Sequence, residues 1–203
     1  MIKSIIKKTG HLLHGVRAKL LKTEIGSVAA TGDEGGMFGL NRFVVAQDKH
    51  GIYECALREI RSGRKRNHWM WYVLPQLKGL GHTYKSSYYG ISCRDEAVAY
   101  LAHEVLGERL RTVCGLLLEQ AELGHTARGV MGSIDAKKTF SSLTLFDAVS
   151  PNDIFAQCLD RWFDGHRDER TLMLLQSAAS HDGGAAATEQ PAEEQPGAVG
   201  AIT

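Results

Sequence analysis

Apolar residues recur every three or four positions through most of the chain, from Leu40 to about Leu175. This spacing is typical of amphipathic helices that bury one face. No segment alternates apolar and polar residues over the length of a strand, and no Asn-Gly hairpin turn occurs. The pattern therefore predicts an all-α fold, a compact multihelical single domain.

Capping and breaking residues set the expected limits of several helices. Gly63 ends the helix that carries Tyr53, and a capping box formed by Ser92 and Asp95 opens another. Ser150, followed by Pro151, is expected to be the N-cap of a helix that ends at Gly165. Further helices are expected over residues 40–47, 106–121 and 135–149, and from residue 169 onward.

The apolar run from Trp69 to Leu74 is too short for its period to identify it, so it predicts either a short buried helix or a strand. Pro75 ends this run.

Both ends of the chain differ in composition from the helical middle. Residues 1–37 place Ile and Leu at helical spacing among Lys and Arg, with no acidic residue before Glu24. Such a basic amphipathic segment can touch a membrane surface or a partner protein, or it can be a frayed extension. Residues 178–203 are rich in Ala, Gly, Glu, Gln and Pro, which predicts a disordered tail. The helical domain is expected over residues 38–177.

Charge and cysteine content limit the partners and the cellular compartment expected for the protein. The net charge of the 203 residues is +1, so no overall field favours nucleic acid. The four cysteines lie far apart on apolar stripes, which predicts buried, reduced thiols and a reducing compartment. The chain has neither an apolar run long enough to span a membrane nor a secretory signal. A cytoplasmic location is therefore expected.

A series of residues in the helical middle forms a recognisable pattern. It includes Arg42-Phe43, Ala46-Gln47, Gly63 to Arg66, His68 to Trp71, Pro75-Gln76, Asp135, Lys138, Ser141-Ser142, Asp168 and Thr171. This pattern resembles the family catalogued as domain of unknown function 1810, some of whose members carry the label calpastatin. The resemblance covers roughly residues 40–175 and implies a compact multihelical fold without an established activity. Glu104 stands where the family usually has proline, and Leu74 where it usually has an aromatic residue.

The first candidate site surrounds the two adjacent tryptophans. Trp69 and Trp71 offer wide stacking faces, and His68 can donate, accept or titrate near neutral pH. Together with Gln76 and Lys78, they could hold a flat polar ligand such as a nucleobase. The alternative is an aromatic core cluster in which His68 bonds a backbone carbonyl.

The second candidate site lies on the helix expected over residues 135–149. Asp135, Lys138 and Ser142 share one face, with Ser141 slightly off that line. A lysine and two hydroxyls suit phosphate or ribose, but the same residues could form a surface ion pair beside a serine cap.

These residues lead to two hypotheses about function. In the first, both groups line one cleft that binds a nucleotide-like or ribosyl ligand; if the chain is catalytic, it is a hydrolase in which His68 or Asp135 acts as general base. In the second, the basic run Arg61–Arg66 and the N-terminal helix contact a partner without catalysis. No metal site, cofactor, nucleic-acid motif or catalytic signature is expected, and the oligomeric state stays open.

Overall fold

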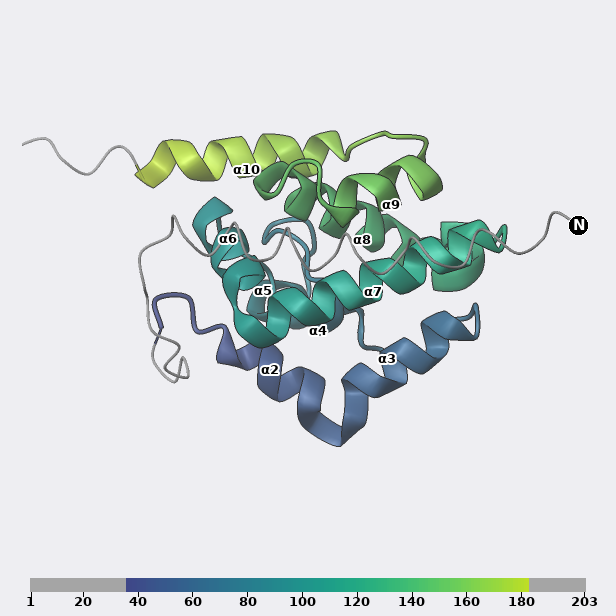
Figure 1. The fold of residues 1–203 in the computed structure, drawn as a ribbon. Coiled ribbons are helices and arrows are strands. Elements are labelled where there is room, and N and C mark those ends of the chain that lie inside the picture. Colours follow the sequence, from purple (N-terminus) through teal and green to yellow (C-terminus); the bar gives the residue numbers. More distant parts are fainter. Residues whose placement is uncertain (1–35, 183–203) are drawn as a thin grey trace, which may run out of the picture. The chain divides into compact units, whose positions relative to one another are not determined.

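The computed structural model describes residues 36–182, which form helices joined by short loops (Figure 1). The first half of this part contains α2 (Asn41–Asp48), the 3-10 turn η1 (Lys49–Gly51), α3 (Ile52–Arg61), α4 (Met70–Val73) and α5 (Tyr84–Tyr88). The second half contains α6 (Arg94–Ala102), α7 (Glu104–Glu122), α8 (Ala127–Val149), α9 (Ile154–Phe163) and α10 (Glu169–Asp182).

The all-α prediction is confirmed across the described residues. Their only pairing of extended segments is a single parallel bridge between Leu77 and Ile91. In this bridge the Lys78 N–H donates to the Ile91 carbonyl at 2.8 Å, and the Ile91 N–H donates to the Gln76 carbonyl at 3.0 Å. The bridge fixes the path of the chain that leaves α4. The apolar run from Trp69 to Leu74, for which the sequence left helix and strand open, forms the helical turn α4.

Helix α7 lies at the centre of the fold, with α2 and α3 on one side and α8, α9 and α10 on the other (Figure 1). It packs against α3, α6 and α9, and α8 packs against α9 and α10. The core between these helices is rich in aromatic side chains. Among them the Tyr100 ring meets Phe43 edge-on with centroids 5.1 Å apart, and it lies 5.4 Å from Phe146.

A glycine allows α6 and α7 to approach each other closely. A Cβ atom at Gly107 would lie 2.1 Å from the Leu101 carbonyl oxygen, a separation that no side chain could occupy. His103 connects α6 to α7 and is the N-cap of α7. Its Nδ1 atom accepts hydrogen bonds from the N–H groups of Val105 and Leu106. Helix α6 therefore packs directly against the backbone of the central helix α7.

Helix α8 begins earlier than expected and bends at Gly132, which has φ 77° and ψ 162°. The first turn, capped by Thr126, is therefore set at an angle to the long segment that follows. The sequence places the start of this helix near Asp135, because the glycine interrupts the apolar pattern.

Two predicted caps are wrong in detail. At α6 the carboxylate that accepts the Ser92 N–H, at 2.7 Å, belongs to Glu96 rather than Asp95. At α9 the N-cap is Asp153, whereas Ser150 is the C-cap of the preceding helix and donates its hydroxyl to Asp153. α8 ends at Val149 as expected and takes Ser150 as its C-cap, so the start of α9 moves on to Asp153.

The ends of the chain bear on the predicted domain limits. Helix α10 continues to Asp182, past the limit at residue 177 expected from composition. The predicted N-terminal extension, apart from residues 36–37, and nearly all of the predicted tail lie outside the described residues.

Cys114 and Cys158 are buried as expected, but Cys55 and Cys93 are only half-buried. Within residues 36–182 no helix is both long and apolar enough to cross a membrane.

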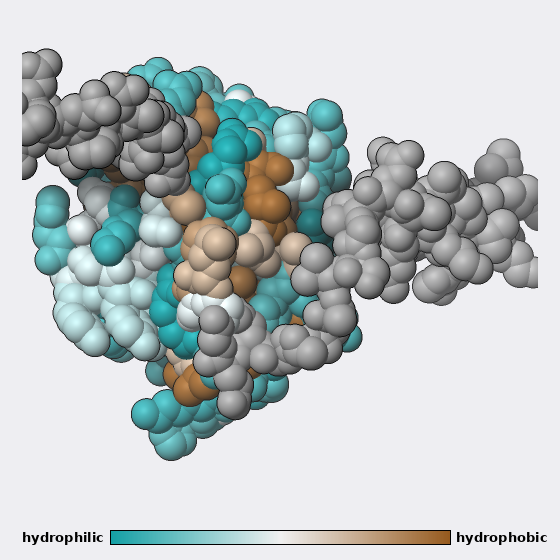
Figure 2. Space-filling model, turned by 90° about the vertical axis from the view of Figure 1, so that its left-hand side faces the viewer, coloured by the Kyte–Doolittle hydropathy of each residue, from teal (hydrophilic) through white to brown (hydrophobic). Residues whose placement is uncertain are grey.

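The surface carries exposed apolar side chains at separate places, including Tyr84, Val98 and Ile134. On the face drawn in Figure 2, hydrophobic atoms form a narrow band between hydrophilic ones.

Candidate functional site

A buried carboxylate organises the loop that carries the first candidate residues. Glu59 of α3 accepts the Arg66 N–H at 2.9 Å, the Asn67 N–H at 3.1 Å and the Trp69 indole N–H at 2.7 Å. Burial raises the pKa of Glu59, but these hydrogen bonds outweigh burial and lower it below its ordinary value. Trp69 is therefore a core residue with a satisfied indole, only 1% exposed, as in the core-cluster alternative.

The single turn of α4 directs the two tryptophans to different sides. Trp69 is buried beside α3, whereas Trp71 is half-buried and faces α8. The Nζ atom of Lys138 lies 4.2 Å from the centre of the Trp71 ring, which is within the range of a cation–π contact. Two stretches far apart in the sequence thus meet here, with Trp71 on one side and Lys138 on the other.

A cavity of about 380 Å³ opens beside this contact, and we call it the Trp71 cavity. It lies among α4, the loop that follows it, α8 and the start of α10. Three cationic side chains and one carboxylate line it, so its charge favours an anion. The lining residues are Trp71, Gln76, Leu80, Gly81, Lys137, Lys138, Phe140, Ser141, Asp168 and Arg170.

Two lysines share one carboxylate behind the Trp71 cavity. Asp135 accepts Lys138 at 2.8 Å and Lys65 at 2.5 Å, and the Lys65 ammonium also lies 4.8 Å from the centre of the Trp69 ring. Burial raises the pKa of Asp135, but its bonds with both lysines outweigh burial and lower the pKa. Because two cations face one anion, Lys138 keeps attraction for a further anion in the cavity.

A carboxylate at the start of α10 closes the other side of the Trp71 cavity. Asp168 Oδ2 accepts the Ser141 hydroxyl at 2.6 Å and the Thr171 hydroxyl at 2.6 Å, while the Asp168 N–H donates to Thr144 Oγ1 at 3.0 Å. These bonds join α8 to α10 and hold the carboxylate in place. Its second oxygen, Oδ1, accepts no hydrogen bond from the described residues.

Gln76 is the unexplained polar residue of the Trp71 cavity. The residue is 6% exposed, yet its side-chain amide makes no hydrogen bond within residues 36–182. Among the described residues the buried side-chain polar atoms that lack a partner are Ser142 Oγ and Trp162 Nε1, so the Gln76 amide is not sealed from the cavity. An amide that lines a cavity and lacks a partner in the protein is available to a ligand, since it can both donate and accept.

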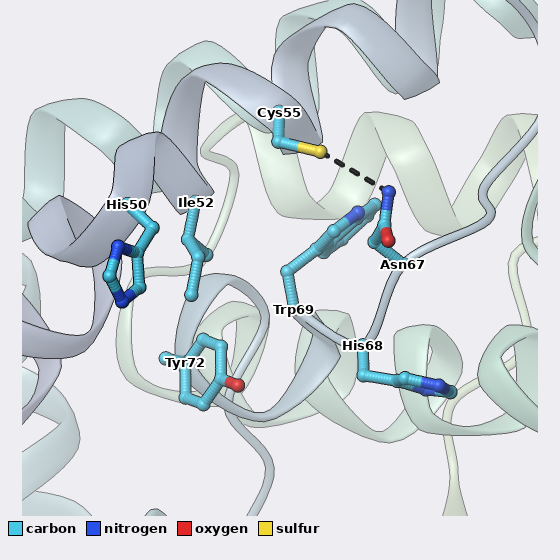
Figure 3. A pocket seen from close by; sticks show the side chains of 7 residues that line it. All are labelled: His50, Ile52, Cys55, Asn67, His68, Trp69 and Tyr72. Atoms are coloured by element: carbon cyan, nitrogen blue, oxygen red, sulfur yellow. Dashed lines mark hydrogen bonds between the residues drawn. The ribbon is translucent and has the colours of Figure 1, made fainter.

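His68 lies at a different cavity, of about 300 Å³, which we call the His68 cavity (Figure 3). Its exposed imidazole points away from Tyr72 and from Cys55, whose sulfur accepts the Asn67 amide at 3.5 Å. The structure therefore does not place His68 beside Asp135 or Lys138 in the Trp71 cavity. The lining residues are His50, Ile52, Cys55, Asn67, His68, Trp69 and Tyr72.

Ser142 and Lys78 do not line the Trp71 cavity. Ser142 is fully buried, and its hydroxyl has no hydrogen-bond partner in the described part of the chain. It belongs to the stripe of Thr139, Leu143 and Phe146, which faces the core because these positions are three or four residues apart. Lys78 is exposed and contributes backbone bonds to the bridge with Ile91.

Besides Leu80 and Gly81, four charged or aromatic residues of the cavity were not among the predicted site residues: Lys137, Phe140, Asp168 and Arg170. Asp168 had a signal, because an acid three residues before Thr171 is the pattern of a helix start, and both belong to the resemblance. The other three resemble ordinary surface or core residues of a helix and carry no such signal.

The basic run expected to meet a partner is only partly available. Arg61, Arg64 and Arg66 are exposed, but the Lys65 side chain is 5% exposed and is held by Asp135. Among residues 36–182 no cluster of three or more His, Cys, Asp or Glu is arranged to hold a metal ion.

Comparisons with known proteins give two matches. A family model described as protein of unknown function (DUF1810) matches residues 37–175, a range that contains every residue of the Trp71 cavity. The crystal structure of the conserved hypothetical protein Rv1873 from Mycobacterium tuberculosis is similar, with 43% sequence identity and a TM-score of 0.64. That match covers 68% of this chain and 97% of the other. No curated protein matches the chain.

Proposed function

The chain belongs to the DUF1810 family of proteins of unknown function, and we propose that it binds a small nucleotide-like anion in the Trp71 cavity. The observation that carries this proposal is the Lys138 ammonium 4.2 Å from the centre of the Trp71 ring, at the wall of a cavity rich in cations. An aromatic face beside positive charge suits a ligand that joins a flat ring to a phosphate.

The groups around the cavity match the parts of such a ligand. Trp71 offers a surface on which a base can stack, and the unpartnered amide of Gln76 can bond the edge of that base. The free Oδ1 of Asp168 can accept a ribose hydroxyl, as carboxylates do in nucleotide sites. Lys137 and Arg170 supply charge for the phosphate.

The proposal concerns binding and does not extend to the hydrolysis considered from the sequence. A general base must lie next to the bond that breaks. His68 lines another cavity, and Asp135 is a weakened base because two lysines lower its pKa. Neither residue supports a hydrolytic step in the Trp71 cavity. The half-buried and buried thiols are compatible with the proposed cytoplasmic location.

Titration of the chain with AMP, GMP, CMP and UMP by calorimetry tests the proposal. We expect at least one of these to bind, and we expect Trp71→Leu and Lys138→Met each to raise its Kd at least tenfold. A stacked base is worth about 1–3 kcal/mol and a charged contact about 1.5–3 kcal/mol, and a tenfold change corresponds to about 1.4 kcal/mol, near the lower end of both ranges.

Lys78→Met is the matched control, because it removes a lysine that is exposed and does not line the cavity. It should leave the Kd within twofold of the wild-type value. Failure of all four mononucleotides to bind would overturn the proposal, and so would an equal loss of affinity in Lys78→Met and Lys138→Met.

A further inference from the structure

A second cavity adjoins the Trp71 cavity along α8. It measures about 340 Å³, and we call it the Trp162 cavity. Lys137 and Phe140 line both cavities, so the two meet at these side chains. The Phe140 ring also lies 4.7 Å from that of Phe163 on α9, which supports the wall between them. The proposed nucleotide site therefore has a second cavity next to it, across Phe140.

Each of the two cavities has one tryptophan in its lining. Trp71 lines the first cavity and not the second, and Trp162, from α9, lines the second and not the first. Ser133 lines the Trp162 cavity and Ser141 the Trp71 cavity, so together they extend about 12 Å along α8 at a rise of 1.5 Å per residue. Two ring-shaped groups separated by a short linker fit this spacing.

Cationic side chains outnumber carboxylates in the lining of both cavities. Lys137 is exposed where the cavities meet, and Arg128 adds a second cation to the Trp162 cavity, whose lining contains no carboxylate. The Trp162 indole N–H is buried and has no hydrogen-bond partner among the described residues. The half-buried Trp162 side chain is therefore held by packing rather than by a hydrogen bond of its indole N–H.

We infer that the two cavities form one elongated site for a ligand with two flat ring groups joined by an anionic linker, the chemistry of a dinucleotide with a diphosphate bridge. This inference rests on the proposed function, because the first ring occupies the Trp71 cavity. Lys137 contacts the linker, and the second ring lies against Trp162.

The experiment compares two ligands that carry the same base as the tightest mononucleotide. One is the nucleoside 5′-diphosphate, and the other is the dinucleoside diphosphate with a 5′–5′ linkage. The second ligand has an additional base and less negative charge, so any gain must come from the second ring. In calorimetric titrations we expect the dinucleoside diphosphate to bind at least tenfold tighter.

Two variants show whether the Trp162 cavity supplies this gain. Trp162→Ala removes the second ring surface, and Ser133→Trp fills the cavity from an exposed position of α8. Each should cancel the tenfold advantage while the Kd of the mononucleotide stays within twofold. If Trp162→Ala loses its helical circular dichroism, Ser133→Trp decides the outcome, because it leaves the core side chains in place.

The possible failures are distinguishable. Equal affinity for the two diphosphates, with mononucleotide binding intact, would overturn the elongated site and leave the proposed function standing. An advantage that survives Ser133→Trp would do the same. If no mononucleotide binds, the proposed function fails and this inference falls with it.

Discussion

At the scale of single residues, Glu59 is the polar group on which the most contacts depend. Replacing it by glutamine should lower the free energy of unfolding by about 2–3 kcal/mol, because the amide cannot accept from every donor that faces the carboxylate. Urea denaturation followed by circular dichroism measures this loss. Glu119→Gln, an exposed substitution on α7, should change stability by less than about 0.5 kcal/mol.

The same residue should make stability depend on pH. Because hydrogen bonds lower the pKa of Glu59 in the folded state, its contribution is complete above the ordinary glutamate pKa of about 4.3 and is lost as the pH falls through the lower, folded value. The difference in stability between wild type and Glu59→Gln should therefore be constant near neutral pH and shrink below about pH 4. A constant difference down to pH 3 would contradict this assignment.

Removing the hydroxyl of Ser142 and removing that of Thr144, both on α8, should change the stability of the protein in different ways. Ser142→Ala deletes a buried hydroxyl that has no partner in the described chain, so the melting temperature should stay the same or rise. Thr144→Val should cost about 1–2 kcal/mol, because Thr144 Oγ1 accepts the Asp168 N–H at the start of α10. Thermal unfolding distinguishes the two, and a large loss in Ser142→Ala would show that its hydroxyl is bonded.

At the scale of elements, two open glycines test the bend of α8. Neither Gly132 nor Gly115 has an atom near the position of an added Cβ, but only Gly132 has a positive φ. Gly132→Ala should destabilise by about 1–3 kcal/mol through backbone strain alone. Gly115→Ala, inside α7, should stabilise by about 0.5–1 kcal/mol. Equal effects in chemical denaturation would mean that the bend at Gly132 is not required.

Sequence periodicity predicted the helices well where an apolar stripe was long, as in α7, and less well where caps compete. Ser150, Pro151 and Asp153 form a strong start signal, yet the preceding helix extends to Val149 and the start moves to Asp153. A local pattern cannot tell which of two helices will use a serine, because packing against the rest of the fold decides it.

The candidate site was predictable in its outline and not in its details. Trp71, Gln76, Lys138 and Ser141 do line one cavity. Trp69 was predicted to line the same site but does not, because the turn of α4 directs it and Trp71 to different sides. The sequence does not show that its indole donates to Glu59, since Glu59 lies on another helix, α3. The function of the predicted residues remains a prediction that the binding experiments test.

At the scale of the whole molecule, the described residues should fold without the rest of the chain. The buried core lies between Leu40 and Leu175, so a protein of residues 36–182 should melt within about 2 °C of the full chain, a shift that corresponds to less than 1 kcal/mol. Ending the chain at residue 167 should be much more harmful. That change removes Asp168, which joins α8 to α10, and the buried Leu175. Differential scanning calorimetry of the three proteins compares them directly.

The different surroundings of the three tryptophans give the protein its own optical reporter. Trp69 is 1% exposed and lines only the separate His68 cavity, whereas Trp71 and Trp162 line the two adjoining cavities. A stacked base would quench the emission of the cavity tryptophans and leave that of Trp69 as a steady background. Fluorescence titration of Trp71→Phe and Trp162→Phe would then assign each step of quenching to one end of the ligand, without any label attached to the protein.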